Sequence, residues 1–302
     1  MRLGIIARNL VPGLAGIGSY IVEMTRELVP ARHRPVFLTP SAREPEELVG
    51  ADIPTIRKGS RSALRNALRN IERSYSIAFT PRCGSNHLCD LLARAGIGRP
   101  TEYFQYELPH WKVADLEAAV SAVLKQNTVN GIFGAKIAHD HCAWLRSVIA
   151  RATGEDKSLG DAFPNHRWIR LVRKDKIAQA MSLYTAQVTQ QWLVWQNDTK
   201  SNEEVPYDFP AIMACYHTVV TAELAWDVYF SEHGIEPLVV TYEDFSERPH
   251  QTVAAIAAYL AVETWYSLEG AEANLRVQRD ENTASLMAQF RHTLIDIGSL
   301  EG

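Results

Sequence analysis

The stretch from Thr80 to Cys89 reads Thr-Pro-Arg-Cys-Gly-Ser-Asn-His-Leu-Cys, and it carries the clearest structural signal in the chain. It follows the apolar run 77–79 and leads into a helix-like segment that Gly96 ends. A strand, a turn that contains glycine and then a helix direct backbone N–H groups and a helix N-terminus at an anion. Arg82 adds a planar cation that suits a phosphate or a sulfate. The stretch therefore predicts an anion site, with a turn that only reverses the chain as the alternative.

This turn is not a Walker phosphate loop, because the string Gly, four residues, then Gly-Lys-Ser/Thr does not occur in the chain. A second basic segment strengthens the prediction of an anion site. Residues 168–172 are typical of a strand, and residues 173–176 open an amphipathic helix. Arg173 would lie at the carboxyl end of that strand and Ser182 about two turns along the helix, at the edge where open α/β sheets bind ligands. The pair is a candidate for a second phosphate, and a solvated basic helix start with a neutral serine is the alternative.

Together the two segments resemble the sulfotransferases that use 3′-phosphoadenosine-5′-phosphosulfate (PAPS), and among them the bacterial trehalose 2-sulfotransferase and lipopolysaccharide sulfotransferase family. The resemblance covers about residues 74–291. It also includes four further segments: Pro100-Thr101-Glu102-Tyr103-Phe104-Gln105, Gly131-Ile132-Phe133-Gly134-Ala135-Lys136, Gln179-Ala180-Met181-Ser182 with Trp192, and Gly234-Ile235-Glu236-Pro237 through Asp244.

The resemblance implies how the sulfuryl donor would be held. In the family the turn grips the 5′-phosphosulfate, which here corresponds to Arg82, Cys83, Gly84, Ser85 and Asn86. The Arg173 and Ser182 pair would hold the 3′-phosphate. Trp192 would either stack on adenine or fill the core. Arg276 and Arg279 lie where a late basic segment would close over the 3′-phosphate.

The resemblance also assigns catalytic residues. Glu102 corresponds to the glutamate that is the family's proposed general base, and pairing with its neighbour Arg99 is the alternative role. Lys136 would face the transferred sulfuryl group and steady its bridging oxygen. His139 is the second candidate for the base, because other sulfotransferase branches place a histidine just after the strand lysine. His110 is a weaker candidate of the same kind.

The sequence departs from the family pattern in the turn and in one later segment. Cys83 replaces a serine and Asn86 replaces a hydroxyl residue, which we expect to weaken donor binding. Between Gln105 and Gly131 the chain is shorter than in the trehalose enzymes, where this stretch shapes the acceptor side and the dimer contacts. We therefore expect a different saccharide acceptor, such as a lipopolysaccharide, capsular or glycolipid precursor. The family resemblance also implies a homodimer.

Composition favours a soluble enzyme. The 302 residues, 46% of them hydrophobic, supply a sizeable core. The formal net charge of −4 argues against a general nucleic-acid binder. The 4 cysteines show no paired metal-ligand spacing and suit a reducing cytosol. No apolar stretch approaches the ~18–20 residues of a membrane span, and the N-terminal apolar run is too short for a signal peptide. We therefore predict a cytoplasmic protein.

No metal site is predicted. No cluster of Asp, Glu and His residues has convincing ligand spacing, and His139-Asp140-His141 is interpreted as part of a strand that holds no metal.

The N-terminal part is predicted to be separate. Residues 1–56 have a βαβ-like pattern that resembles the opening of nucleotide-sugar glycosyltransferases. Because no second complete domain fits before residue 74, we predict a small α/β appendage without catalysis of its own. Residues 57–73 are predicted to be a basic linker with partly helical spacing. This linker either contacts an anionic glycan or a membrane surface peripherally, or it forms a solvated helix face. Residues 74–302 would form the sulfotransferase domain.

Elsewhere strands alternate with helices, which implies a mostly parallel sheet covered on both faces. Together with the resemblance, this pattern predicts a P-loop-like three-layer α/β/α sulfotransferase fold. Helices are predicted at 114–125, 142–153, 176–195, 209–233 and 250–260, and strands near 75–80, 131–136, 167–172 and 236–241.

These features predict a sulfotransferase that moves a sulfuryl group from PAPS to a carbohydrate hydroxyl, by in-line displacement with a general base and without a metal. Two alternatives remain open. The first is a non-catalytic relative that binds a nucleotide or a glycan. The second is a nucleotide-dependent kinase or a glycosyltransferase remnant, against which the absent Walker string and the absent second domain argue.

Overall fold

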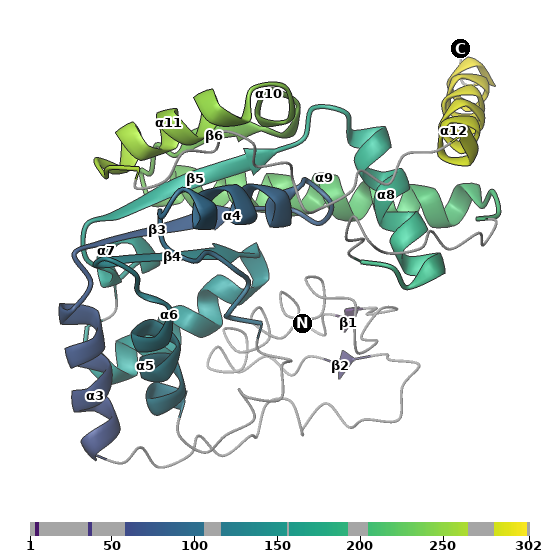
Figure 1. Cartoon of the computed structure of the whole chain (residues 1–302). Coiled ribbons are helices and arrows are strands. Elements are labelled where there is room, and N and C mark those ends of the chain that lie inside the picture. Colours follow the sequence, from purple (N-terminus) through teal and green to yellow (C-terminus); the bar gives the residue numbers. More distant parts are fainter. Residues whose placement is uncertain are drawn as a thin grey trace.

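A parallel sheet of four strands forms the centre of the protein (Figure 1). The structure is a computed structural model that describes residues 4–5, 36–37, 58–105, 116–155, 157–192, 205–264 and 281–300. The strands are, in their order across the sheet, β4 (Ile132–Ile137), β3 (Arg73–Ala78), β5 (His166–Val172) and β6 (Leu238–Thr241). Because every pairing in this sheet is parallel, the carboxyl ends of the strands meet at one edge.

Strand β3 occupies the centre, between β4 and β5. All of its residues after Arg73 are buried, as expected for a parallel strand covered on both faces. In the register of the sheet, Ile77 lies opposite Lys136 on one side and Ile169 on the other. The turn that follows β3 therefore emerges between the ends of β4 and β5.

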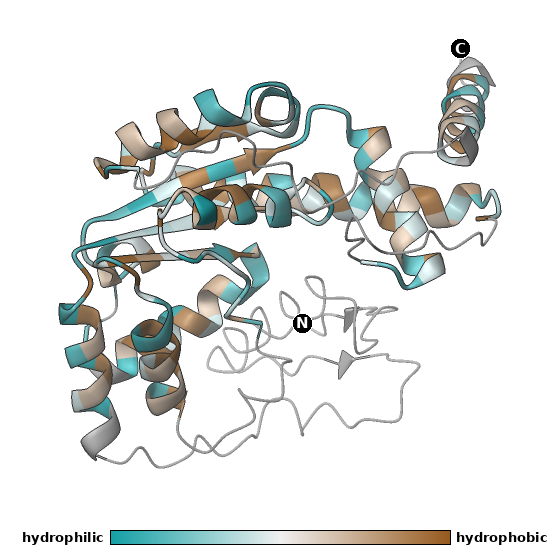
Figure 2. Cartoon of the chain, in the orientation of Figure 1, coloured by the Kyte–Doolittle hydropathy of each residue, from teal (hydrophilic) through white to brown (hydrophobic). Residues whose placement is uncertain are grey.

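Two layers of helices cover the sheet, and the predicted three-layer α/β/α arrangement is confirmed. One face packs against α4 (Ser85–Arg94), α10 (Tyr242–Glu247) and α11 (Pro249–Leu260). The other face packs against α3 (Lys58–Arg69), α5 (Leu116–Asn127), α6 (His139–Thr153), α7 (Leu159–Ala162) and α9 (Phe209–Glu232). Figure 2 shows hydrophobic and hydrophilic residues alternating along these helices, as expected where one side of a helix packs on a core.

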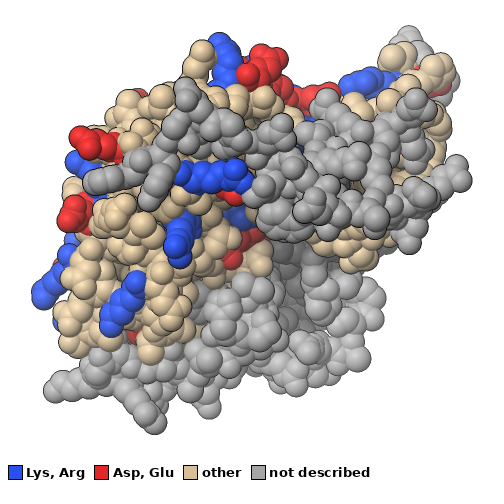
Figure 3. All heavy atoms as spheres, viewed as in Figure 1, with Lys and Arg blue, Asp and Glu red and all other residues tan. Residues whose placement is uncertain are grey.

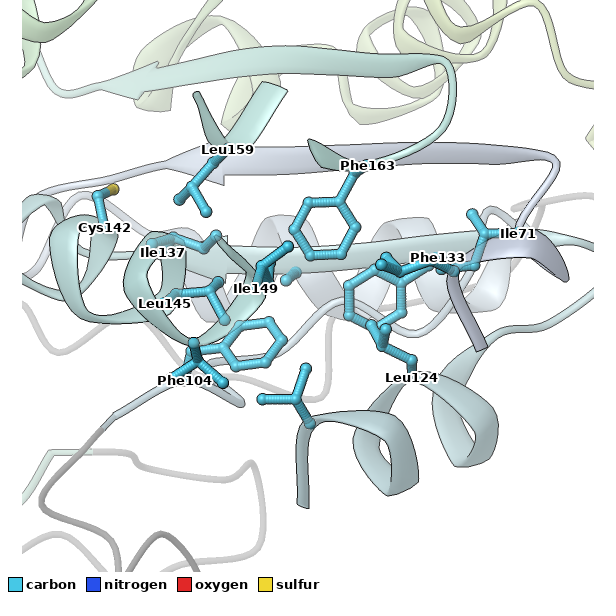
Figure 4. Packing of buried hydrophobic residues seen from close by; sticks show 14 of the residues in the cluster. Ile71, Phe104, Leu124, Phe133, Ile137, Cys142, Leu145, Ile149, Leu159 and Phe163 are labelled. Atoms are coloured by element: carbon cyan, nitrogen blue, oxygen red, sulfur yellow. The ribbon is translucent and has the colours of Figure 1, made fainter. Parts of the chain in front are cut away.

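The core on the second face contains a cluster of aromatic rings (Figure 4). Phe133 on β4 stacks on Phe163, with ring centroids 5.9 Å apart, and lies 6.2 Å from the ring of Phe104. Phe104 comes from the loop that follows α4 and is 1% exposed. Burial of this ring anchors the loop that carries Glu102 beside β4.

A third cluster of buried residues joins α8 (Lys176–Thr189), α9 and α12 (Glu281–Leu300) beyond the end of the sheet (Figure 1). Helix α8 begins at the N-cap Asp175, whose side chain accepts a hydrogen bond from the backbone of Ala178. It ends where Gln190 takes the left-handed φ of 56°. The predicted helix 176–195 was thus too long at its C-terminal end, because residues 190–192 are described and are not helical.

Two other segments differ from the sequence predictions. Residues 57–73, predicted to be a basic linker with partly helical spacing, contain helix α3 and the first residue of β3. The helical spacing is confirmed, whereas the burial of Leu64, Ala67 and Leu68 in the core was not predicted. His139-Asp140-His141 opens helix α6 and is not a strand.

The N-terminal residues 1–56 are described only at β1 (Gly4–Ile5) and β2 (Val36–Phe37), which pair in parallel. Among the described residues, the helices are too short or too polar to span a membrane.

Candidate active site

The turn after β3, residues 79–84, has a backbone shaped for an anion. Arg82 and Gly84 both adopt left-handed conformations, with φ of 64° and 87°. The Cys83 N–H between them donates to the Thr80 carbonyl at 3.3 Å. Gly84 is the N-cap of α4, and no side chain caps this helix end. The first N–H groups of the helix therefore face the turn as hydrogen-bond donors.

Gly84 is required at its position by packing as well as by its φ. A Cβ atom there would lie 2.5 Å from Cδ2 of Tyr242 and 3.1 Å from Cζ of Phe245. Both rings belong to α10, which follows β6. The turn therefore lies against α10, and any side chain at residue 84 would force the two apart.

The Cys83 side chain is buried in the core next to the turn. It is fully buried and packs into the core cluster that contains Tyr75, Ile77 and Leu88. Burial raises the pKa of this thiol. Because the thiol is enclosed by the core, we expect the exchange of serine for cysteine at this position to have little effect on an anion in the turn. Ser85 is also buried, and Asn86 is half-buried at the start of α4.

Arg82 joins the turn to helix α8. Its Nε donates to Ser182 Oγ at 3.0 Å, and its Nη1 donates to the backbone carbonyl of Trp192. Burial lowers the pKa of Arg82, and the nearby charge of Arg173 lowers it further. Two guanidinium groups held this close in a buried setting favour a bound anion, because an anion would offset their mutual repulsion.

Arg173 lies directly after β5 and is 6% exposed. Its Nη1 donates to the carbonyl of Arg82 at 3.2 Å, and its guanidinium lies 4.8 Å from the ring centroid of Tyr242. The Glu243 carboxylate accepts hydrogen bonds from the backbone N–H groups of Lys174 and Asp175, at 3.1 and 3.3 Å. Helix α10 thereby holds both the side chain of Arg173 and the chain that follows it.

Lys136 and Glu102 form an ion pair on the other side of the turn. Lys136 Nζ lies 2.9 Å from Glu102 Oε2, and the two side chains are 6% and 18% exposed. The expected alternative partner of Glu102 was Arg99, but the described contact is with Lys136. The ammonium also lies 4.5 Å from the ring centroid of Phe79, which begins the turn. The backbone N–H of Lys136 donates to the Thr101 carbonyl at 3.0 Å, so β4 holds the loop next to Glu102 as well.

His139 is directed at a different group of side chains. Its ring packs edge-on against Trp226 and Tyr229 of α9, with centroids 5.4 and 6.1 Å away. Burial lowers its pKa, which is compatible with a neutral base. Glu102, by contrast, pairs with Lys136, whose ammonium contacts Phe79 at the start of the turn. The ring of His139 packs against α9 instead.

The remaining predicted site residues fall into two groups. Trp192 is 47% exposed, so the alternative that it fills the core is wrong, and stacking on adenine stays a prediction. His110, Arg276 and Arg279 lie outside the described residues.

Three residues that hold the site were not predicted from the sequence: Tyr242, Glu243 and Gln179. Gln179 Nε2 donates to Thr80 Oγ1 at 2.8 Å and to the Pro81 carbonyl at 2.7 Å. The spacing of Gln179 and Ser182 was the available signal, because residues three apart share one face of a helix.

The candidate site residues therefore lie in two groups, one on each side of the turn 79–84. Arg82, Arg173 and Ser182 lie toward β5, and Lys136 and Glu102 lie toward β4. The described residues contain no group of three His, Cys, Asp or Glu side chains able to hold a metal ion. On the face shown in Figure 3, basic and acidic side chains of the described residues are interspersed.

Comparison with known proteins shows the family of the chain. The family model of the Stf0 sulphotransferases matches residues 74–293. The chain belongs to the Stf0 sulphotransferase family. This confirms the family resemblance inferred from the turn and from the later segments.

Two known proteins are similar to this Stf0 sulphotransferase. It is 25% identical over 208 residues to "Trehalose 2-sulfotransferase" of Mycobacterium tuberculosis (strain ATCC 35801 / TMC 107 / Erdman), covering 56% of this chain and 77% of that protein. Among solved structures, the sulfotransferase domain of the Synechococcus PCC 7002 olefin synthase matches with a TM-score of 0.37 and 15% identity, covering 74% of this chain and 95% of that one.

Proposed function

We propose that this Stf0 sulphotransferase transfers a sulfuryl group from PAPS to a hydroxyl group of a carbohydrate. The observation that carries the proposal is the placement of the buried Arg173 and the partly buried Arg82 on one side of an anion-shaped turn, and of the Lys136–Glu102 pair on the other. PAPS fits this arrangement because it carries one anionic group at the 3′ position and another at the 5′ position of its nucleoside. The sulfur that reacts would then lie between the cationic side chains on the two sides of the turn.

The proposed donor contacts follow from the position of each group. The 5′-phosphosulfate would accept hydrogen bonds from Arg82 and from the backbone and side chains of Ser85 and Asn86 at the start of α4. The 3′-phosphate would lie between Arg173 and Ser182. Trp192 would stack on the adenine with its exposed ring. Arg276 and Arg279 would add charge at the 3′-phosphate, as the family resemblance implies.

The proposed reaction is an in-line displacement at sulfur. The acceptor oxygen forms a bond to sulfur while the bond between sulfur and the bridging phosphate oxygen breaks, and 3′-phosphoadenosine-5′-phosphate (PAP) leaves with that electron pair. Glu102 takes the proton of the acceptor hydroxyl. Lys136 stabilises the charge that develops on the bridging oxygen, as cations do in phosphoryl transfer. The ion pair keeps the base and this cation next to each other before the substrates bind.

The acceptor is proposed to be a saccharide. The name of the similar mycobacterial protein, trehalose 2-sulfotransferase, supports a sugar hydroxyl as the nucleophile. The shorter stretch between Gln105 and Gly131 favours a saccharide other than trehalose, for example on a glycolipid or lipopolysaccharide precursor. A cytoplasmic location, peripheral contact with a membrane and a homodimer remain part of this proposal.

The test is transfer of label from PAPS labelled at the sulfuryl group. The purified chain is incubated with labelled PAPS and, in parallel, with trehalose, other soluble sugars and a glycolipid extract. We expect labelled product with at least one saccharide acceptor, and much less with the Lys136→Met variant at equal concentration of folded protein. PAP binding without transfer to any saccharide would instead support the non-catalytic alternative.

A further inference from the structure

Helix α8 buries a glutamine among apolar residues of the same helix. Gln179 is fully buried, and its neighbours on the same helix, Ala178, Ala180, Met181 and Leu183, are buried apolar residues. An apolar side chain of similar length would be expected at such a position if packing alone decided it. The amide of Gln179 therefore needs another explanation.

The contacts of Gln179 lie entirely on the turn after β3. Its Nε2 donates to Thr80 Oγ1 and to the Pro81 carbonyl, which are 99 and 98 residues earlier in the chain. One turn further along α8, Ser182 Oγ accepts a hydrogen bond from Arg82 Nε. One face of α8 thus holds three consecutive residues of the turn, from Thr80 to Arg82.

These contacts end at Arg82, whose backbone conformation is unfavourable. Arg82 takes a left-handed φ of 64°, which costs free energy for any residue with a Cβ atom and persists only where the surroundings impose it. The Pro81 carbonyl that Gln179 holds belongs to the peptide immediately before Arg82. The amide is therefore placed to fix the orientation of that peptide and the anion-shaped backbone that follows.

The carbonyl oxygen of the Gln179 amide indicates that this glutamine does not serve to stabilise the fold. Gln179 Oε1 is buried, and within the described part of the chain it has no hydrogen-bond partner. A buried acceptor without a partner is destabilising, whereas methionine at this position would bury no polar atom.

We propose that Gln179 is a positioning residue that holds the donor turn in its anion-binding form. The proposal rests on the function proposed above, because it assigns the turn to the 5′-phosphosulfate of the donor. In this role Gln179, which is fully buried, would set the affinity of the turn for the donor without contacting the donor itself.

The test compares two substitutions of the same kind on one helix. Gln179→Met removes both hydrogen bonds to the turn. Gln187→Met, two turns further on, removes a contact with Cys215 Sγ at 3.2 Å and leaves the turn intact. Circular dichroism first establishes that each full-length variant is folded at the assay temperature, and calorimetric titration with PAP then gives the dissociation constant. We expect about tenfold weaker PAP binding for Gln179→Met, from two lost neutral hydrogen bonds. We expect an unchanged dissociation constant for Gln187→Met.

Gln179→Glu gives a readout that a general packing role would not produce. A protonated carboxyl can still donate one hydrogen bond to the Pro81 carbonyl, whereas a carboxylate cannot. The PAP dissociation constant of this variant, relative to wild type, should therefore rise as the pH is raised. In steady-state assays the KM for PAPS should rise while the KM for the acceptor stays the same.

The outcomes separate the two proposals. If the wild-type chain does not bind PAP, the proposed function fails. If the wild type binds PAP and Gln179→Met binds it equally well, the positioning role is overturned while the proposed function stands. If Gln179→Met does not fold, the pH series of Gln179→Glu decides, and a pH-independent ratio overturns the positioning role.

Discussion

Lys136 holds Glu102 from two directions: its ammonium lies 2.9 Å from Glu102 Oε2, and its backbone N–H donates to the carbonyl of the preceding residue, Thr101, at 3.0 Å. The edge strand β4 thus fixes both the side chain and the main chain of the candidate base. Because β4 pairs with β3, the same register sets the distance from the base to the turn that follows β3.

This relationship predicts the effect of Glu102→Gln. The amide can keep a hydrogen bond to Lys136, but it cannot accept a proton from the acceptor hydroxyl. We expect kcat to fall by a factor of about 10²–10⁴, the usual contribution of a general base, with little change in PAP affinity. Steady-state kinetics and calorimetry measure the two effects.

The matched control for Glu102→Gln is Glu117→Gln. Glu117 is 1% exposed on α5 and lies 3.7 Å from Arg151, in an ion pair distant from the turn in the sequence and in the fold. Its replacement should lower the free energy of unfolding and leave the kcat of the folded protein unchanged. If Glu102→Gln turned over at the wild-type rate, the assignment of the base would move to His139, and His139→Gln would then be the variant to assay.

Gly84→Ala tests the turn itself. The added methyl group would meet the ring of Tyr242 at 2.5 Å, and alanine would have to adopt a φ of 87°. We expect loss of PAP binding and a lower free energy of unfolding. Gly234→Ala is the control, since Gly234 also has a positive φ, of 59°, but has nothing within 4 Å of the added atom. It should cost about 1–2 kcal/mol of stability and keep PAP affinity. Equal PAP binding by Gly84→Ala and wild type would rule out this turn as the donor site.

Cys83→Ser restores the residue usual in the family, and its expected effect is on stability. The side chain at this position is fully buried among apolar residues, so a hydroxyl would be buried there in place of a thiol. We expect a loss of about 1–3 kcal/mol in the free energy of unfolding, from denaturant titration, and an unchanged PAP dissociation constant. A clear gain in PAP affinity would show that the side chain does reach the donor.

We expect His166 to make the protein less stable in acid. Burial lowers the pKa of this residue to about 3, and its Nδ1 lies 2.9 Å from Ser74 Oγ, which itself donates to the Pro164 carbonyl. The folded state favours the neutral ring, whereas the unfolded chain takes up a proton near the ordinary pKa of about 6.5. The stabilisation is therefore complete above that pH and is lost as the pH falls from about 6.5 toward 3, by up to ~1.4 kcal/mol per pH unit.

His166→Asn checks this contribution, because the asparagine amide can replace Nδ1 as a donor but does not titrate. The dependence of the free energy of unfolding on pH should become flatter between pH values of about 4 and 6. The exposed His250 on α11, changed to Asn, should keep the wild-type dependence. An identical pH dependence for all three proteins would show that His166 is not the group responsible.

The sequence predicted the parts of the site that lie close to a strand end. Arg82, Lys136 and Arg173 each follow or end a strand of apolar residues. Because parallel strands bring their ends to one edge, the proximity of these three residues follows from local sequence patterns alone. The glycine at residue 84 signalled a left-handed turn for the same local reason.

Contacts that depend on tertiary packing could not be predicted in this way. That Glu102 pairs with Lys136 and not with Arg99 depends on how the loop after α4 is anchored by Phe104. The contact of the Arg173 guanidinium with the ring of Tyr242 and the hydrogen bonds of Gln179 to the turn join segments about 70 to 100 residues apart. The helical start at His139 was also missed, because a short polar run after a strand has no periodicity that separates strand from helix.

The most direct test of the donor site is calorimetric titration of the full chain with PAP, beside ATP and a nucleotide sugar, for the wild type, Arg173→Ala and Arg170→Ala. Arg170 is on the same strand but pairs with Asp227 of α9, on the face away from α10. We predict that PAP binds selectively, that Arg173→Ala weakens it at least about tenfold through the loss of charged hydrogen bonds, and that Arg170→Ala leaves it unchanged. Absence of PAP binding by the wild type, or equal binding by folded Arg173→Ala, would contradict the assignment of this turn as the site of the sulfuryl donor.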